Sequence, residues 1–206
     1  MRSPLPLRLL LCVLGGCVAA QTAPAAAESE TILFIRHAEK SPAGLGQLSC
    51  KGLNRALALA GLMQRRFPKL GAVFAPDPSQ QKLDGGPSPY DYVRPLATVE
   101  PTAVRFGLPV HADIGYAESD KLLAALGDPA LRAATVLVAW EHHQLEAMVP
   151  RLVGSLGGSA ARVPKWGHGD YDSIWRVTVT RDGDTTHTTF AQEQEGLDGQ
   201  PEACPQ

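Results

Sequence analysis

Hydrophobic residues form two short uninterrupted runs in this chain, at 31–35 and at 135–140. Both runs are rich in β-branched and apolar side chains and are too short for helices, which is typical of strands buried on both faces of a sheet. A shorter run at 72–75 predicts another strand. Apolar and polar residues alternate at 173–180, and the chain returns at 185–190 after an Asp-Gly turn, so these segments predict a hairpin.

Between these strands, apolar residues recur at helical spacing. They predict helices at about 51–67, 94–106, 118–126 and 145–156, with prolines or glycines at their ends. Pro101 is expected to kink or split the second of these helices, because proline removes a backbone donor from a helix interior.

Strands that alternate with helices predict a fold class of α/β type, a three-layer α/β/α sandwich with a mainly parallel sheet. The final hairpin would add antiparallel strands at one edge. A chain of 206 residues suits one sizeable hydrophobic core. We therefore expect one domain at 31–191, preceded by a signal peptide at 1–20 and a linker at 21–30, and followed by a loose polar tail at 192–206.

The N-terminus has the composition of a bacterial export signal. Arg2 and Arg8 supply positive charge, residues 9–14 supply an apolar core, and small residues follow. Residues 18–20 resemble a signal-peptidase site, whereas the four residues that end in Cys17 resemble a lipobox, in which this cysteine would carry lipid. The mature protein is expected to be periplasmic or lipid-anchored in the cell envelope.

Charge is nearly balanced, with 19 Lys and Arg against 21 Asp and Glu, and no basic run predicts nucleic-acid binding. Beyond the N-terminus no window approaches the length of apolar sequence that a membrane span needs. Cys50 and Cys204 could form a disulfide after export or remain separate thiols. No group of His, Cys and Asp has metal-ligand spacing, so neither a metal nor a cofactor is expected.

Two irregular segments stand out by composition. The loop at 76–89 is rich in Pro, Gly, Ser and Gln, and loops of this length are often functional or disordered. The segment 166–175 could line a substrate cleft, but packing beneath a loop is the favoured interpretation. Away from the apolar helix stripes and strands, surface positions are expected for Arg55, His111, His168 and His187.

Candidate chemistry follows directly after the two buried strands. Arg36 and His37 follow the first, His142 follows the second, and Arg94 begins a helix. The carboxyl ends of parallel strands form the usual ligand site of an open α/β sheet. Arginine binds phosphate with a bidentate fork, a neutral imidazole can attack phosphorus, and a second imidazole can hydrogen-bond the developing charge. These residues predict a small cationic site for a phosphorylated ligand.

The motifs at these positions resemble those of the histidine phosphatase superfamily, which includes phosphoglycerate mutases and acid phosphatases. Arg36-His-Ala-Glu-Lys40 matches the signature Arg-His-Gly/Ala-Glu, and 48–60 matches a Leu-Thr-x-x-Gly-x-x-Arg-Ala-x-x-Leu-Ala segment, with Ser49 in place of Thr. Arg94-Pro-Leu-Ala-Thr98 matches a later Arg-x-x-x-Thr, and a second histidine follows an apolar strand at 140–142. The resemblance covers about 31–175 and implies a phosphoglycerate mutase-like fold.

The resemblance implies roles for individual residues. His37 would be the phosphorylated nucleophile, while Arg36, Arg94 and His142 would hold the transferring phosphoryl group. The family's proton donor is an acid between Arg94 and His142 in the chain. Glu118 is favoured for that role over the other acids of this segment, Asp113 and Asp120.

The second histidine motif departs from the family pattern. The usual Ser-His-Gly is replaced by Glu141-His142-His143, so two histidines compete for one role. His142 is preferred, because the apolar residues after it then fall where the family has its buried helix residues. Glu141 and His143 either brace the site or lie at a solvated helix start.

Together these features predict an exported, metal-independent phosphatase that hydrolyses phosphomonoesters through a phosphohistidine at His37. Its partner would be a small phosphorylated substrate. A phosphomutase is the alternative among enzymes, and a non-catalytic phosphate-binding module of the same fold is the alternative outside them.

Overall fold

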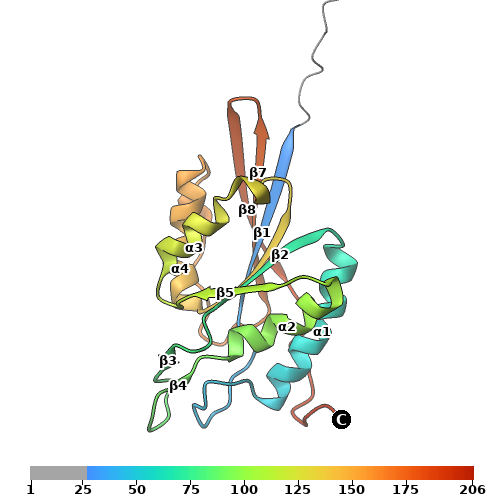
Figure 1. The fold of residues 1–206 in the computed structure, drawn as a ribbon, viewed down its shortest axis with the longest axis vertical. Coiled ribbons are helices and arrows are strands. Elements are labelled where there is room, and N and C mark those ends of the chain that lie inside the picture. The colour runs from blue at the N-terminus through green and yellow to red at the C-terminus, as the bar shows by residue number, and fades with distance from the viewer. Residues whose placement is uncertain (1–26) are drawn as a thin grey trace, which may run out of the picture.

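A six-stranded sheet forms the centre of the computed structural model, which describes residues 27–206 (Figure 1). The strands lie in the order β5-β2-β6-β1-β7-β8. Their bounds are Glu28–Arg36 for β1, Leu70–Pro76 for β2, Val110–Ile114 for β5, Thr135–Trp140 for β6, Ser173–Asp182 for β7 and Thr185–Gln194 for β8. The predicted signal peptide, its cleavage site and the Cys17 lipobox lie outside the described residues.

The two apolar runs of the sequence are neighbouring strands at the middle of this sheet. β1 and β6 are parallel, with Cα partners from Thr31 and Thr135 to Arg36 and Trp140. β2 and β5 continue the parallel part on one side, and β7 and β8 pair antiparallel on the other. The mainly parallel sheet and the antiparallel edge hairpin are therefore confirmed.

Helices cover both faces of the sheet, which makes three layers. On one face lie α1 (Cys50–Arg66) and α2 (Arg94–Phe106), and on the other lie α3 (Ser119–Leu126) and α4 (His142–Ser155) (Figure 1). Short 3-10 helices occur at Pro129–Leu131 and Ala160–Arg162. Alternate residues of β1 serve the two cores: Leu33 and Ile35 pack with α1 and α2, whereas Ile32 and Phe34 pack with α3 and α4.

Several boundaries differ from the prediction. β1 begins at Glu28, inside the predicted linker, because Glu28 to Glu30 pair with β7. α2 runs unbroken through Pro101, so of the two expected effects of this proline, a kink or a split, the split does not occur. The long loop contains a two-stranded sheet that was not predicted, formed by β3 (Gln81–Lys82) and β4 (Tyr90–Asp91). Two-residue strands carry too little periodicity to be found from sequence.

The polar tail is held against the domain, so the expectation that it is loose is wrong. Cys50, the first residue of α1, forms a disulfide with Cys204, which decides between the two thiol states left open by the sequence. Asn54 also donates from Nδ2 to the carbonyl oxygens of Pro201 and Ala203, at 2.9 and 2.8 Å. The tail therefore covers the first turns of α1.

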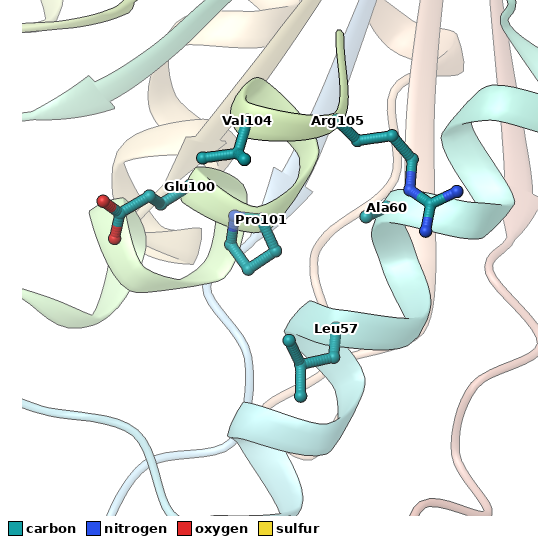
Figure 2. A pocket seen from close by; sticks show the side chains of 6 residues that line it. All are labelled: Leu57, Ala60, Glu100, Pro101, Val104 and Arg105. Atoms are coloured by element: carbon teal, nitrogen blue, oxygen red, sulfur yellow. The ribbon is translucent and has the colours of Figure 1, made fainter. Parts of the chain in front are cut away.

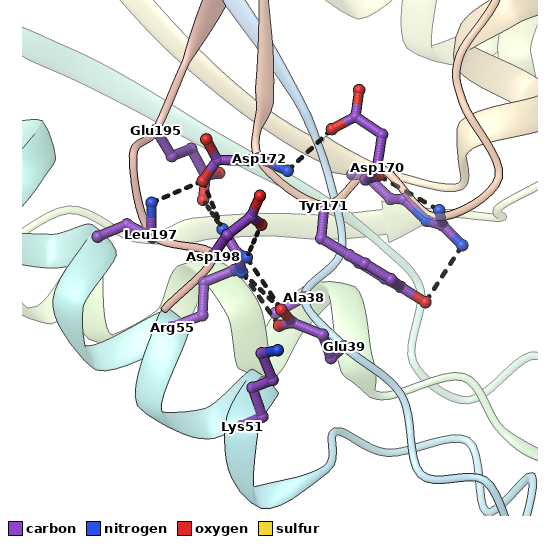
Figure 3. Close-up of polar contacts among 12 residues, drawn as sticks. Ala38, Glu39, Lys51, Arg55, Asp170, Tyr171, Asp172, Glu195, Leu197 and Asp198 are labelled. Atoms are coloured by element: carbon purple, nitrogen blue, oxygen red, sulfur yellow. Dashed lines mark hydrogen bonds and ion pairs between the residues drawn. The ribbon is translucent and has the colours of Figure 1, made fainter. Parts of the chain in front are cut away.

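Arg55 is buried beneath this tail, and the prediction that it is a surface charge is wrong. Its side chain is 1% exposed and contacts four carboxylates, those of Glu39, Asp172, Glu195 and Asp198, at 2.7–3.1 Å (Figure 3). Arg55 lies off the apolar stripe of α1, but polar partners distant in the sequence cover it. We refer to these five residues as the Arg55 cluster.

Among the described residues, no helix is both long and apolar enough to cross a membrane.

Candidate active site

The parallel pairing of β1 and β6 brings the two histidine segments to the same sheet edge. Arg36 is the last residue of β1 and pairs with Trp140, the last residue of β6. The pairing continues one step further, because the backbone N–H of His37 donates to the carbonyl of Trp140 at 3.1 Å. Arg36, His37 and His142 are all buried, with 5%, 2% and 7% of their surfaces exposed.

The first turn of α2 is tied to the segment after β1. The backbone N–H of Ala38 donates to Oγ1 of Thr98 at 2.9 Å, and that hydroxyl donates to the carbonyl of Arg94 at 2.8 Å. The backbone N–H of Arg94 itself donates to the carbonyl of Gly46. This geometry explains the Arg-x-x-x-Thr spacing: Thr98, one turn after Arg94, fixes the helix beside His37.

The imidazole of His37 is held in one orientation. Its Nδ1 lies 2.8 Å from the carbonyl oxygen of Ala38, an acceptor only, so Nδ1 carries the proton and Nε2 carries the lone pair. Arg94 Nε donates to that Nε2 at 3.1 Å. Burial, together with the positive charge of Arg94, holds the pKa of His37 well below its usual value of 6.5. The ring is therefore neutral at physiological pH, as a nucleophile requires.

Arg36 is anchored by the segment between Lys165 and β7. Its Nη1 donates to the backbone carbonyls of His168 and Asp170 at 2.6 and 3.3 Å, and its guanidinium lies 4.0 Å from the centre of the Tyr171 ring. Packing was the favoured interpretation of residues 166–175, and it is confirmed for Trp166 and for Trp175 of β7, which pack together in the core. The middle part of this segment, however, forms one side of the site.

The structure separates the two competing histidines. The side chain of His142 is 9% exposed, whereas that of His143 is 58% exposed. Nδ1 of His142 lies 3.0 Å from a carboxylate oxygen of Glu141. Burial raises the pKa of Glu141, but the contacts with His142 and Lys82 outweigh it and hold the pKa at about 2. Glu141 therefore braces His142 as an ionised carboxylate.

Sequence reasoning did not assign several residues that surround Arg94. Asp84 Oδ2 lies 2.7 Å from Arg94 Nη1, and Lys40 Nζ contacts the other oxygen of Asp84 at 2.8 Å. The ring of Tyr92 lies under the Arg94 guanidinium at 4.4 Å and 6.0 Å from the His37 ring. Lys82 reaches Glu141 at 3.7 Å. In the sequence, the composition of the loop at 76–89 was the one indication that Lys82 and Asp84 lie near the site.

None of the three acids considered as proton donors has a hydrogen bond or ion pair with Arg36, His37, Arg94 or His142. Glu118 accepts from the backbone N–H of Gly115 at 2.9 Å and pairs with Lys121, and these contacts lower its pKa. Asp120 pairs with Arg151, and Asp113 is an exposed residue of the edge strand β5. Among the acids of the described chain, Asp84 is the one that contacts Arg94.

A separate hollow lies between α1 and α2, on the outer face of the molecule (Figure 2). It measures about 570 Å³ and is lined by Leu57, Ala60, Glu100, Pro101, Val104 and Arg105. None of these side chains belongs to the sheet edge described above, and none is a candidate nucleophile. The hollow therefore does not change the location of the candidate site.

The known proteins that match this chain do so in structure. No protein-family model matches the sequence, and no curated protein matches it significantly. A solved structure of a candidate phosphohistidine phosphatase, SixA, from Nakamurella multipartitia matches with a TM-score of 0.51 and 18% identity, over 76% of this chain and 87% of that one. The protein histidine phosphatase SixA in complex with tungstate matches with a TM-score of 0.50 and 17% identity, over 80% of this chain and 97% of that one.

These two structures belong to the histidine phosphatase (phosphoglycerate mutase-like) superfamily. The chain therefore has the phosphoglycerate mutase-like fold, as the motifs implied. At this level of identity the match establishes the fold alone, and the chemistry has to be argued from the site residues of this chain.

Proposed function

We propose that this protein is a phosphatase that hydrolyses phosphomonoesters through a phosphohistidine at His37. The observation that carries the proposal is the state of the His37 ring. It is buried and neutral, its Nδ1 proton is directed at Ala38, and its Nε2 lone pair faces the guanidinium of Arg94. The SixA structures of the same fold, described as phosphohistidine phosphatases, support phosphatase chemistry.

In the first proposed step, Nε2 of His37 attacks the phosphorus, a P–N bond forms and the P–O bond to the leaving group breaks. The Nε–H group of Arg94 would then donate to a phosphoryl oxygen and no longer to Nε2 of His37, which frees the lone pair of the imidazole. Arg36 and His142 would hold the other oxygens, because charge spreads over them in the transition state. Water then attacks the phosphorus of phosphohistidine, the P–N bond breaks, and the proton of the water passes to the carboxylate that had protonated the leaving group. Phosphate is released and the ring is neutral again.

Positive charge in this mechanism comes from side chains. Arg36 and Arg94 are both buried at the sheet edge, and charge-assisted hydrogen bonds to phosphate are strong in such surroundings. We therefore propose that turnover needs no added metal ion. Assays in the presence of EDTA test this point, since a requirement for a divalent cation would appear as lost activity.

The leaving oxygen needs a proton unless it is a weak base. We retain Glu118 as the proposed donor, although its carboxylate must leave Gly115 and Lys121 before it can reach the site. A second candidate is Asp84, because it already contacts the guanidinium that faces His37. The two candidates can be distinguished by substitution, because removal of the true donor should slow esters with poor leaving groups far more than esters with good ones.

We further propose that the protein is exported, with small phosphate esters as substrates. The composition of residues 1–20 supports export, and so does the disulfide, because disulfides persist mainly in oxidising compartments. Fractionation of cells would test it: recovery of the full-length chain in the cytoplasm with a free Cys50 thiol would contradict export.

The test of the proposed function is His37→Ala, assayed with p-nitrophenyl phosphate. Turnover is expected to fall to background, since removal of a covalent nucleophile can cost as much as about 10⁶-fold. Wild-type protein quenched during turnover should carry phosphate that is stable to base and labile to acid, and the variant should carry none. Retention of most of the activity by His37→Ala would refute the mechanism.

A further inference from the structure

Three histidines gather beside the candidate site although they are not close in sequence. His142 and His143 begin α4, and His168 lies in the segment before β7. One ring nitrogen from each lies within 4.8 Å of the other two. The ring centres of His142 and His143 are 3.9 Å apart, and the His168 ring meets them edge-on at 5.6 and 5.5 Å.

Carboxylates lie near two of these three rings, as they often do beside metal-binding histidines. Such histidines direct one ring nitrogen at a carboxylate or carbonyl, so that the other nitrogen is free to bind the ion. Nδ1 of His142 lies 3.0 Å from Glu141, and Nδ1 of His143 lies 3.9 Å from Glu146. Both ring nitrogens of His142 are buried and have no hydrogen-bond partner among residues 27–206, although Nδ1 lies near the Glu141 carboxylate. The cluster therefore contains a free imidazole nitrogen.

We propose that His142, His143 and His168 bind one divalent transition-metal ion of the zinc type. Imidazole suits zinc, copper and nickel, and three protein ligands with an open fourth position are a common arrangement for zinc. Two nitrogens bound at about 2.1 Å to the same tetrahedral ion lie about 3.4 Å apart. The three ring nitrogens, which lie within 4.8 Å of one another, must therefore draw closer by side-chain rotation, and the side chain of His143 is 58% exposed.

A bound ion would inhibit the enzyme, a consequence that rests on the proposed function. His142 is one of the residues that would hold the phosphoryl group, and Nε2 is the atom it would use. The same nitrogen cannot bind a metal ion and hydrogen-bond a phosphoryl oxygen. The ion and the substrate would therefore compete for His142, and the mature protein would lose activity when zinc is abundant.

Calorimetric titration of tag-free, chelator-treated protein with zinc alone tests the binding. We expect one ion per chain, with affinity reduced about tenfold or more in His168→Gln and in His143→Gln. The matched control is His187→Gln, since His187 is exposed on β8 and outside the cluster. Equal affinity in wild type and both cluster variants, or an equal loss in the control, would overturn the site.

Inhibition of turnover gives a second, separate readout. His168 holds Arg36 through its backbone carbonyl, so inhibition of each variant by zinc is expressed relative to the metal-free rate of that same variant. Zinc should inhibit wild-type protein and the His187→Gln control, and the concentration for half inhibition should rise about tenfold or more in His168→Gln. Zinc binding without inhibition would overturn the competition. A protein that binds zinc but never hydrolyses a phosphomonoester would instead refute the proposed function and leave the metal site standing.

Discussion

Two buried arginines of this molecule, Arg55 and Arg94, have opposite surroundings. Both are nearly inaccessible, with 1% and 2% of their surfaces exposed. Arg55 is enclosed by four carboxylates, which use its Nε, Nη1 and Nη2 groups (Figure 3). Arg94 has one carboxylate, Asp84, and otherwise faces the imidazole of His37 and the ring of Tyr92. Arg55 therefore has more neighbouring carboxylates than its charge requires, whereas Arg94 has one.

The two surroundings also differ in how many polar groups are satisfied. Around Arg94, several buried groups have no hydrogen-bond partner among the described residues, including Arg36 Nε, Tyr92 Oη and His142 Nε2. Unpaired buried groups cost stability, and a group of them in one place is where a ligand could pair with them. The comparison supports a structural role for the Arg55 cluster and the proposed role of the Arg94 side in anion binding.

Among the tests of this comparison, the largest expected effect concerns the proposed proton donor. Glu118→Gln and Asp84→Asn are compared on an alkyl phosphate, whose leaving group needs a proton, and on p-nitrophenyl phosphate, whose leaving group scarcely does. The variant that removes the donor should slow the alkyl ester by about 10²–10⁴-fold and the nitrophenyl ester much less. Asp172→Asn, in the Arg55 cluster, is the control and should leave the ratio of the two rates unchanged. If neither variant changes that ratio, no side-chain acid acts from these positions.

Next in size is the effect of Arg55→Ala on stability. Removal of this guanidinium leaves buried carboxylates without their counter-charge, which costs about 3–5 kcal/mol of unfolding free energy. Urea denaturation of the disulfide-intact protein measures this loss. Arg94→Ala should cost much less stability, because it relieves a group of neighbouring cations. Equal losses in the two variants would contradict the distinction between them.

A smaller effect is expected on phosphate binding. Arg94→Ala should raise the inhibition constants of phosphate and vanadate about tenfold to a hundredfold, since a charged hydrogen bond contributes about 1.5–3 kcal/mol. Arg55→Ala, assayed at a temperature where it remains folded, should leave these constants nearly unchanged. Similar constants for the two variants would refute the assignment of Arg94 to phosphate binding.

A further test of the Arg55 cluster is a pH dependence of stability from Glu195. Burial, with the neighbouring carboxylates, raises the pKa of Glu195 from 4.5 to about 8, although Arg55 opposes this shift. The folded protein then binds a proton that the unfolded chain releases. This contribution to stability is full below pH 4.5 and is lost as the pH rises through 8. Glu195→Gln should flatten the curve of unfolding free energy between these values, and an unchanged slope would contradict the shift.

Much of the fold could be predicted because its strands and helices carry local periodic signals. The ends of two buried strands located Arg36, His37 and His142, and the order of motifs placed Arg94 beside them. The burial of Arg55 could not be predicted, because its partners lie on three other segments and its own helix position is polar. Asp84 was missed for a related reason: an irregular loop has no periodicity that indicates where a side chain points. The same holds for the histidine cluster, which depends on the path of the chain before β7.

The position of β1 in the sheet has a consequence for the order of assembly. It is the first strand of the described chain, yet its neighbours are β6 and β7, so that Thr31 pairs with Thr135 and with Thr178. During synthesis β1 leaves the ribosome long before either partner exists, and pairings between such distant residues form slowly. The strand that precedes His37 must therefore remain unpaired at least until β6, which ends at Trp140, has been made. Cys204, three residues later than Pro201 and near the end of the tail, can close its bond to Cys50 only after that point.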